Sequence, residues 1–383
     1  MKLRFVRGGL GVLVVAALLL AGGPALGAPG KPLTSVTWKE ATPLPFPGTR
    51  FDGAVDPATN RVYFLGFRLA DNSTDGSVWY YDIATKTYTD TGVDMPVPIS
   101  NYSIAVLTDP KGLGFYIFGG RDNNGVIVTD VQVYYPATNK AKDLTTDPWP
   151  GTTPSGCVSL PAMGVAVVKN KAYGLGGVAF TANGCVADEQ TNQTWRFDPM
   201  APDGSRWKKS KKLNVARGYI TTAVFGTKIY AIGGDTNELG TLIPQSAVES
   251  WTPGDTSWND AGVADLPEPC DESQAFAFTK GQLINTITLA GCGQWPAALA
   301  DVLQYDVPGN SWSIIGALNE ARRNQAGANI GSPKKPKLFV LGGYAADGAT
   351  TLASTEIGKA GVSSGAPSPH TAPSGSSGNV STN

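Results

Sequence analysis

Six polar residues recur at comparable points of this sequence, each near the start of an apolar segment that we predict to be a strand. Four are arginines, while an asparagine and an aspartate occupy the matching points elsewhere: Arg50, Asn101, Arg217, Asp271, Arg322 and Arg323. A guanidinium presents a planar fork of N–H donors, so such a set could bind a carboxylate, a sugar or an acidic peptide. The structural alternative is that these arginines bond to backbone carbonyls of an adjacent sheet.

Carboxylates gather near one of these points. They are Glu268, Asp271 and Glu272, on either side of Cys270. Glycoside hydrolysis requires a pair of carboxyl groups, but we favour a solvated loop held by Cys270. A second segment, Asp71–Gly76, places oxygen donors at alternate positions before a glycine, as in the first half of a calcium loop. Asp82 stands where that loop needs a glutamate, so we interpret the segment as a polar loop between strands.

Histidine chemistry has almost no basis in this sequence. The one histidine is His370, in a C-terminal segment rich in Ser, Pro and Gly. A Ser–His–Asp triad, a His-ligated zinc or copper and imidazole acid–base catalysis would all lack their central residue. The formal net charge of −1 gives no electrostatic reason for binding nucleic acid or an anionic membrane. We therefore expect no metal, no cofactor and no nucleic-acid partner.

A short apolar strand that ends in glycine recurs about every 54 residues and indicates six repeat units. The marker glycines are Gly66, Gly119, Gly176, Gly233, Gly291 and Gly342. Each unit continues with a polar loop, an aromatic-containing strand and, in most units, a fourth strand with an aromatic residue: Tyr88, Trp207, Trp258 or Trp312. Four short strands form one antiparallel sheet that cannot bury both faces alone, so six sheets must pack around an axis. The glycines permit close backbone approach and positive φ.

These units resemble the kelch repeat, in which a strand ending in two glycines is followed by a tyrosine and a tryptophan. The resemblance covers residues 38–358, although the first unit has Gly66-Phe67 and the second has Ala141 in place of the fourth-strand aromatic. It implies an all-β fold, a six-bladed kelch-type β-propeller over residues 36–360. The last unit lacks a fourth strand, and the segment around Trp38 resembles that strand. We therefore expect the N-terminal strand to complete the last blade and close the ring.

The two ends of the chain differ from the repeats. Lys2, Arg4 and Arg7 precede an apolar run and then small residues, which is typical of a secretory signal peptide. We predict that residues 1–27 are this signal and that residues 28–35 are a linker; the alternative is an uncleaved anchor. Residues 361–383, rich in Ser, Gly and Pro, are predicted to be a disordered tail. The protein would then be secreted (periplasmic in a Gram-negative bacterium), with no membrane span after cleavage.

Four cysteines in a secreted chain predict two disulfides, and three pairings satisfy them. We favour Cys157–Cys185 and Cys270–Cys292, because each pair lies within one repeat unit. Glycosylation sequons begin at Asn72, Asn101, Asn192 and Asn379, and we expect glycans there only in a eukaryotic source.

The resemblance implies several functions, which the residues reduce to two. Copper radical oxidases of the kelch family need histidine ligands, and thiohydroximate-specifying kelch proteins use an iron motif that ends in histidine, so both are excluded. We predict a secreted, non-catalytic module that binds an extracellular protein or glycan through loops at one mouth of the central channel, where the resemblance places the arginines. The alternative is a sugar-acid enzyme similar to sialate mutarotases, using arginines and carboxylates at that mouth. A third interpretation is a component of a cell wall or matrix.

Overall fold

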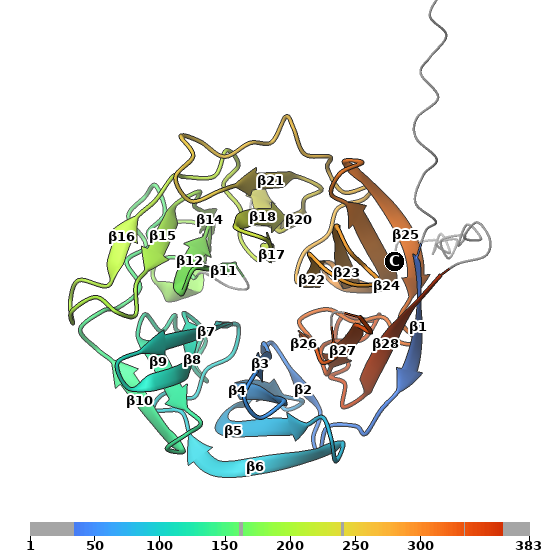
Figure 1. The fold of residues 1–383 in the computed structure, drawn as a ribbon. Coiled ribbons are helices and arrows are strands. Elements are labelled where there is room, and N and C mark those ends of the chain that lie inside the picture. The colour runs from blue at the N-terminus through green and yellow to red at the C-terminus, as the bar shows by residue number, and fades with distance from the viewer. Residues whose placement is uncertain (1–33, 161–163, 239–240, 333, 363–383) are drawn as a thin grey trace, which may run out of the picture. The chain divides into compact units, whose positions relative to one another are not determined.

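The chain folds into antiparallel sheets that are arranged as six blades around a central axis (Figure 1). The structure, a computed structural model, describes residues 34–160, 164–238, 241–332 and 334–362. The expected signal peptide lies outside these residues, as do most of the expected linker and all but two residues of the expected tail. Within the described ranges, no helix has the length and hydrophobicity needed to cross a lipid bilayer.

The strands of each blade follow one another outwards from the axis. Blade 1 contains β3 (Ala54–Asp56), β4 (Arg61–Leu69), β5 (Thr74–Asp82) and β6 (Thr87–Asp94), with β2 (Gly48–Thr49) paired to the end of β4. Blade 2 contains β7 (Ser103–Asp109), β8 (Gly112–Phe118), β9 (Val131–Tyr135) and β10 (Lys140–Leu144). Blade 3 contains β11 (Val165–Val168), β12 (Lys171–Leu175), β15 (Thr194–Phe197) and β16 (Trp207–Lys209).

The second half of the ring repeats this order with one shorter sheet. Blade 4 contains β17 (Thr221–Phe225), β18 (Lys228–Ile232) and β21 (Val248–Trp251), and its fourth strand is reduced to a bridge between Ser250 and Asn259. Blade 5 contains β22 (Gln274–Phe278), β23 (Thr286–Gln294), β24 (Ala297–Asp306) and β25 (Ser311–Ala317). Blade 6 contains β26 (Ala326–Asn329), β27 (Lys337–Leu341), β28 (Thr355–Val362) and β1 (Thr34–Glu40). Two small hairpins, β13–β14 (Val178–Ala179, Glu189–Gln190) and β19–β20 (Asp235–Glu238, Thr241–Pro244), extend from blades 3 and 4.

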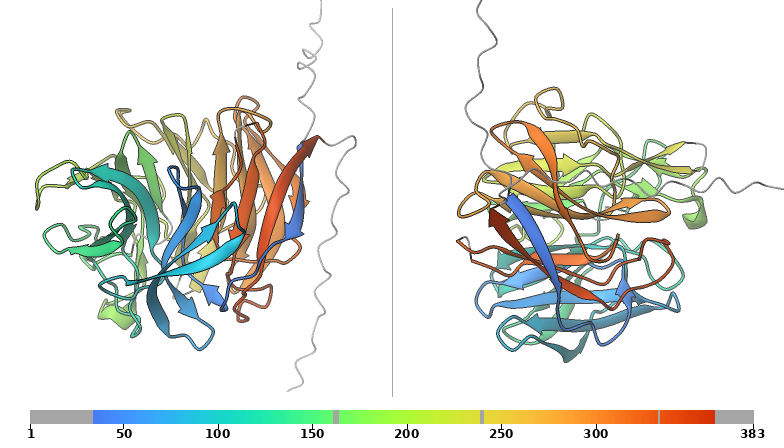
Figure 2. Two further views of the ribbon diagram at one scale, coloured as in Figure 1. Left: turned by 60° about the horizontal axis from the view of Figure 1, so that its bottom comes forward. Right: turned by 90° about the vertical axis from the view of Figure 1, so that its right-hand side faces the viewer.

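The N-terminal strand, β1, closes the ring, as the sequence predicts. β1 pairs antiparallel with β28 at the outer edge of blade 6, with Trp38 opposite Gly358 (Figure 2). The Trp38 ring covers that glycine, because a Cβ on Gly358 would lie 2.9 Å from it. Successive first strands contact each other around the axis, and the contact between β26 and β3 completes the circle. The paired strands extend two residues beyond each bound expected for the propeller, 36 and 360.

Fourth-strand tryptophans link neighbouring blades. The indole N–H of Trp207 in blade 3 donates to the Asp147 carbonyl beyond blade 2, at 3.0 Å. The indole N–H of Trp258 likewise donates to the Lys211 carbonyl at 2.7 Å, and that of Trp312 donates to the Ala264 carbonyl at 2.9 Å. These three tryptophans therefore join the edges of blades 3, 4 and 5 to the segment that leaves the preceding blade.

The marker glycines sit where adjacent blades touch. Gly233 has a φ of 56°, and a Cβ there would lie 1.9 Å from the carbonyl oxygen of Cys270 in the next blade. Only glycine fits both the conformation and the space. Blade 5 and blade 4 can approach this closely because the side chain is missing.

Candidate binding site at the channel mouth

Five residues, each before the first strand of a different blade, are joined by a chain of main-chain hydrogen bonds that we call the mouth belt. They are Arg50, Asn101, Tyr219, Glu272 and Asn324, with φ between 48° and 59°. The N–H of Asn101 donates to the carbonyl of Arg50 at 2.7 Å. In the same way the N–H of Arg50 donates to the carbonyl of Asn324, that of Asn324 to Glu272 and that of Glu272 to Tyr219. The matching place in blade 3 falls in residues 161–163, outside the described residues. A left-handed backbone is costly for residues other than glycine. The main-chain bonds of the belt hold these five residues in that conformation and so fix the positions from which their side chains extend.

A second set of residues reaches the mouth from the position two residues after each marker glycine. These residues pair with the residue just before a belt position, in the pairs Thr49–Arg68, Ser100–Arg121, Gly218–Asp235, Asp271–Gly293 and Arg323–Tyr344. The pairing places the charged or aromatic side chains of four blades beside the belt, because blade 5 has Gly293 at this point.

Arg50 and Arg121 each bond to a tyrosine or amide of another blade. Arg50 donates through Nε to the Tyr344 hydroxyl and through Nη1 to Asn101 Oδ1, both at 3.2 Å. Arg121 donates through Nη2 to the Tyr219 hydroxyl at 2.7 Å, and its guanidinium lies 3.7 Å from the ring centre of Phe180. Both arginines are half-buried and have no carboxylate partner within ion-pairing distance among the described residues.

Arg323 is held more tightly. Its Nη1 lies 2.5 Å from Glu272 Oε2, and its guanidinium lies 4.7 Å and 4.9 Å from the ring centres of Trp295 and Tyr344. Arg323 and Glu272 are 1% and 4% exposed, whereas Trp295 is 43% exposed. One ion pair is therefore buried under an aromatic ring that faces solvent.

Like charges are crowded at the mouth. Burial and the nearby Arg50 lower the pKa of the Arg68 guanidinium. Burial and the charge of Glu272 raise the pKa of Asp235 and of Asp271 well above the usual range for aspartate. The raised pKa values of Asp235 and Asp271 favour their neutral forms, so these two carboxyl groups neutralise less of the arginines' positive charge than their number suggests.

A cavity of about 320 Å³ lies inside the belt, in the central channel. Its walls come from the inner strands of all six blades. Three of the lining residues, Asp52, Thr221 and Ser273, come one or two positions after a belt residue. Asp52 accepts N–H groups from Gly53 at 2.8 Å and from Ile104 at 3.2 Å. Burial nevertheless raises the pKa of Asp52 to about 6, which suits proton transfer near neutral pH.

The structure brings four of the six sequence-predicted residues to the mouth and places two elsewhere. Arg50, Asn101, Asp271 and Arg323 lie in or beside the belt. The guanidinium of Arg217 is fully buried within blade 4, where it bonds to the carbonyls of Gly233 and Ala247 at 2.6 Å and to Glu249 at 2.8 Å. Arg322 makes the equivalent contacts in blade 6. These two arginines do bond to backbone carbonyls, but to those of their own blade and not of an adjacent one.

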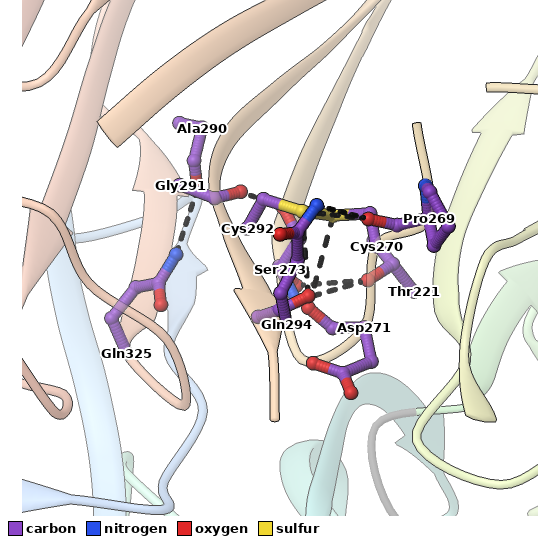
Figure 3. Close-up of a disulfide and its surroundings, with 11 residues drawn as sticks. Thr221, Pro269, Cys270, Asp271, Ser273, Ala290, Gly291, Cys292, Gln294 and Gln325 are labelled. Atoms are coloured by element: carbon purple, nitrogen blue, oxygen red, sulfur yellow. Dashed lines mark hydrogen bonds between the residues drawn. A yellow bond between two sulfur atoms is a disulfide. The ribbon is translucent and has the colours of Figure 1, made fainter. Parts of the chain in front are cut away.

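The interpretation of the acidic cluster as a solvated loop is wrong for two of its three residues. Asp271 and Glu272 are 1% and 4% exposed, because the segment after Cys270 runs through the belt. Glu268 is half-buried. Figure 3 shows the Cys270–Cys292 disulfide with the Asp271 carboxyl pointing away from it. Both expected disulfides, this one and Cys157–Cys185, are confirmed.

The described sequons differ in exposure. Asn72 is exposed on a turn, and the Asp71 carboxylate of that turn is bound by the N–H and hydroxyl of Ser73. Asn192 is half-buried, and its amide donates to the Leu213 carbonyl. Asn101 is 1% exposed, which leaves no room for a glycan in the folded protein. The Asn379 sequon lies outside the described residues.

Sequence reasoning missed Arg68, Arg121, Tyr219 and Tyr344, although a signal for three of them exists. Arg121 and Tyr344 come directly after the second glycine of their units, and Arg68 occupies the same place after Gly66-Phe67. The position after the glycines, and not only the start of the first strand, therefore contributes to the mouth.

Comparison with known proteins agrees with the repeat architecture. The model of the KLHDC2/KLHL20/DRC7 kelch-repeats domain matches residues 54–242. Beta-scruin of Limulus polyphemus is 26% identical over 216 residues, which cover 56% of this chain and 21% of that protein. Kelch-like protein terF of Aspergillus terreus is 25% identical over 316 residues, covering 79% of this chain and 64% of that protein.

A solved structure has the same fold. The structure of YjhT superimposes with a TM-score of 0.61 at 18% identity, covering 82% of this chain and 95% of that one. The chain spans less than two thirds of the length of the curated relatives named above. With its six blades, its glycine-terminated strands and the domain model that matches residues 54–242, the chain is a six-bladed β-propeller similar to the kelch-repeat proteins.

Proposed function

We propose that this chain is a secreted, non-catalytic module that binds an extracellular protein or glycan through an anionic group held at the mouth belt. The observation that carries this proposal is the excess of arginine there. Arg50, Arg68, Arg121 and Arg323 surround the belt, and only Arg323 forms an ion pair among the described residues. A carboxylate or sulfate of a ligand would supply the missing partners.

Unpartnered amide atoms at the same place support this. Both side-chain polar atoms of Asn324 and the Nδ2 of Asn101 are buried without a hydrogen-bond partner. Buried polar groups are normally satisfied by protein, water or ligand. With two arginines beside them, these amides fit the oxygen atoms of a sugar acid or of an acidic peptide.

The binding test removes charge at the mouth and, as a control, at Arg61, which lies at the end of β4 away from the mouth residue Arg68. Arg50→Gln and Arg121→Gln each remove a guanidinium without a carboxylate partner, while Arg61→Gln removes one at the other end of β4 from Arg68. The purified proteins would be applied to arrays of neutral and acidic glycans and to acidic peptides. We expect the wild type and Arg61→Gln to bind acidic ligands and the mouth variants to bind about tenfold or more weakly, as befits loss of a charge-assisted bond. Equal binding by all three variants would refute the proposal.

Asp52 favours a second candidate, an enzyme acting on a sugar acid. A carboxyl group with a pKa of about 6 lies in the cavity directly inside the arginines. An arginine could hold the substrate carboxylate while Asp52 moves a proton at the ring oxygen or anomeric hydroxyl. The test is the rate at which anomers of a sugar acid interconvert, followed by NMR with wild type and Asp52→Asn. If the wild type accelerates interconversion and Asp52→Asn does not, the protein is an enzyme and the non-catalytic proposal is wrong. If the wild type gives no acceleration, the enzymatic proposal is wrong.

A further inference from the structure

A cleft between blades 3 and 4 concentrates positive charge in a chain whose formal net charge is −1. Its volume is about 640 Å³, and five cationic side chains line it: Lys169, Lys171, Arg196, Lys209 and Lys211. We call this the basic cleft. Asp255 is its one lining carboxylate, and that group accepts the N–H of Thr252. The cleft is therefore strongly cationic although the protein is not.

Most of this charge is unpaired. Lys171 forms an ion pair with Asp198, but among the described residues no carboxylate lies within ion-pairing distance of Lys169, Arg196, Lys209 or Lys211. The Nε of Arg196 is buried without a hydrogen-bond partner. Four uncompensated cations held at one concave site repel each other, and an anionic ligand would relieve that repulsion.

The basic cleft is separate from the mouth belt and longer than one anion requires. Lys169 and Lys171 flank the turn between β11 and β12, at the opposite end of β12 from its glycine pair. A neighbouring hollow of about 380 Å³ shares Lys211 with the cleft and adds Lys212. Charges thus continue along the segment that follows β16 and suit a ligand carrying several negative groups in a row.

The chemistry of the walls favours a carbohydrate over a nucleic acid. Tyr173 and Trp251 form part of the wall but are each 5% exposed, so neither offers the open ring face on which a base would stack. Hydroxyl groups of Ser210, Thr227 and Thr252 lie in the same wall, where they can bond to sugar hydroxyls. We propose that the basic cleft binds an anionic polysaccharide, with sulfate or carboxylate groups paired to its lysines.

The experiment measures binding of a heparin oligosaccharide and of an oligogalacturonate to the intact protein as a function of salt concentration. The test variant is Lys209→Gln/Lys211→Gln. The matched control is Lys140→Gln/Lys142→Gln, which removes two exposed lysines at alternate positions on the outer strand of blade 2. Lys209→Arg/Lys211→Arg keeps the charge and tests whether charge itself matters.

We expect the wild type, the control and the arginine variant to bind at least one of the two probes. The glutamine test variant should bind about tenfold more weakly, with the slope of log affinity against log salt reduced by about 1 to 2. The heparin and oligogalacturonate arms distinguish sulfate from carboxylate ligands. The loss caused by Lys209→Gln/Lys211→Gln should be the same in the wild type and in an Arg50→Gln background, so failure here and failure of the proposed function are distinguishable.

Three results would overturn the inference. They are no binding of either probe by the wild type, equal losses in the test and control variants, or tighter binding of a single-stranded DNA oligonucleotide than of both glycans. Circular dichroism of each variant shows that a loss of binding is not a loss of fold.

Discussion

The guanidinium of Arg322 lies 2.7 Å from the carboxylate of Glu356, and both side chains are buried inside blade 6. Arg322 also bonds to the carbonyls of Gly342 and Ser354 at 2.9 Å and 3.1 Å. The same brace exists in blade 4 between Arg217 and Glu249. In each case one side chain ties the start of a blade to its second and third strands.

Breaking one brace should destabilise the propeller strongly. Arg322→Met leaves Glu356 as a buried carboxylate without its cation, and we expect the free energy of unfolding to fall by about 3 to 5 kcal/mol. Denaturant titration measures the loss. The double variant Arg322→Met/Glu356→Leu removes both charges and should recover most of the stability; if it is as unstable as the single variant, the ion pair is not what the brace contributes.

The tryptophan bond between blades should have a smaller, separable effect. Trp312→Phe keeps an aromatic ring on β25 but removes the N–H that donates to the Ala264 carbonyl, and we expect a loss of about 1 kcal/mol. Trp258→Phe should behave alike, since its bond to Lys211 is equivalent. Thermal unfolding of the two variants checks this, and Trp295→Phe is the control, because that ring is 43% exposed. An equal loss in the control would contradict a role for the inter-blade bond.

Asp52 should make stability depend on pH between about 4.5 and 6.5, above its unfolded pKa and up to just beyond its folded pKa. Burial raises its pKa from 3.8 to about 6. The folded protein then holds this proton over a range where the unfolded chain has lost it, so the stability of the wild type relative to Asp52→Asn falls as pH rises through about 6. Unfolding curves of both proteins at several pH values measure the difference. Asp347→Asn is the control: hydrogen bonds with Thr350 lower the pKa of Asp347 to about 2, so its difference from wild type should stay flat over this range. A flat difference for Asp52→Asn would show that its carboxyl titrates normally.

The two disulfides should differ in what they support besides stability. Cys270→Ser/Cys292→Ser opens a loop of 22 residues and Cys157→Ser/Cys185→Ser one of 28; each should cost about 3 kcal/mol through the entropy of the unfolded chain. Only the first pair borders the belt residue Glu272, so only its removal should also weaken ligand binding at the mouth. Binding and unfolding are measured on both variants. Equal effects on binding would mean that the disulfide does not position the belt.

The repeat period predicted the blades, and the reason is physical. Glycines such as Gly233 and aromatic residues such as Trp312 lie at contacts between neighbouring blades, and because such contacts recur around the ring, these residues recur in phase and can be counted. The missing last strand and the spare segment at Trp38 predicted closure in the same way.

The site was predicted only in part, because moving by one residue along the sequence changes the side to which a side chain points. Arg322 and Arg323 are adjacent, yet the first braces blade 6 and the second reaches Glu272 in blade 5. Successive residues of an extended chain point to opposite sides. An alignment of the repeat units that is accurate only to within one residue therefore assigns the same role to two arginines with different roles. The burial of Asp271 and Glu272 depends on the belt, whose five left-handed residues are of four different types and so give no common sequence signal.

The pairing of β1 with β28 has a mechanical consequence. Thr34 lies opposite Val362 in that antiparallel pair, so a pull applied at these two residues would separate the strands one hydrogen bond at a time, as a zipper opens, and would not shear all of them together. Tension between the ends of the propeller would therefore open its closing seam from the Thr34–Val362 end.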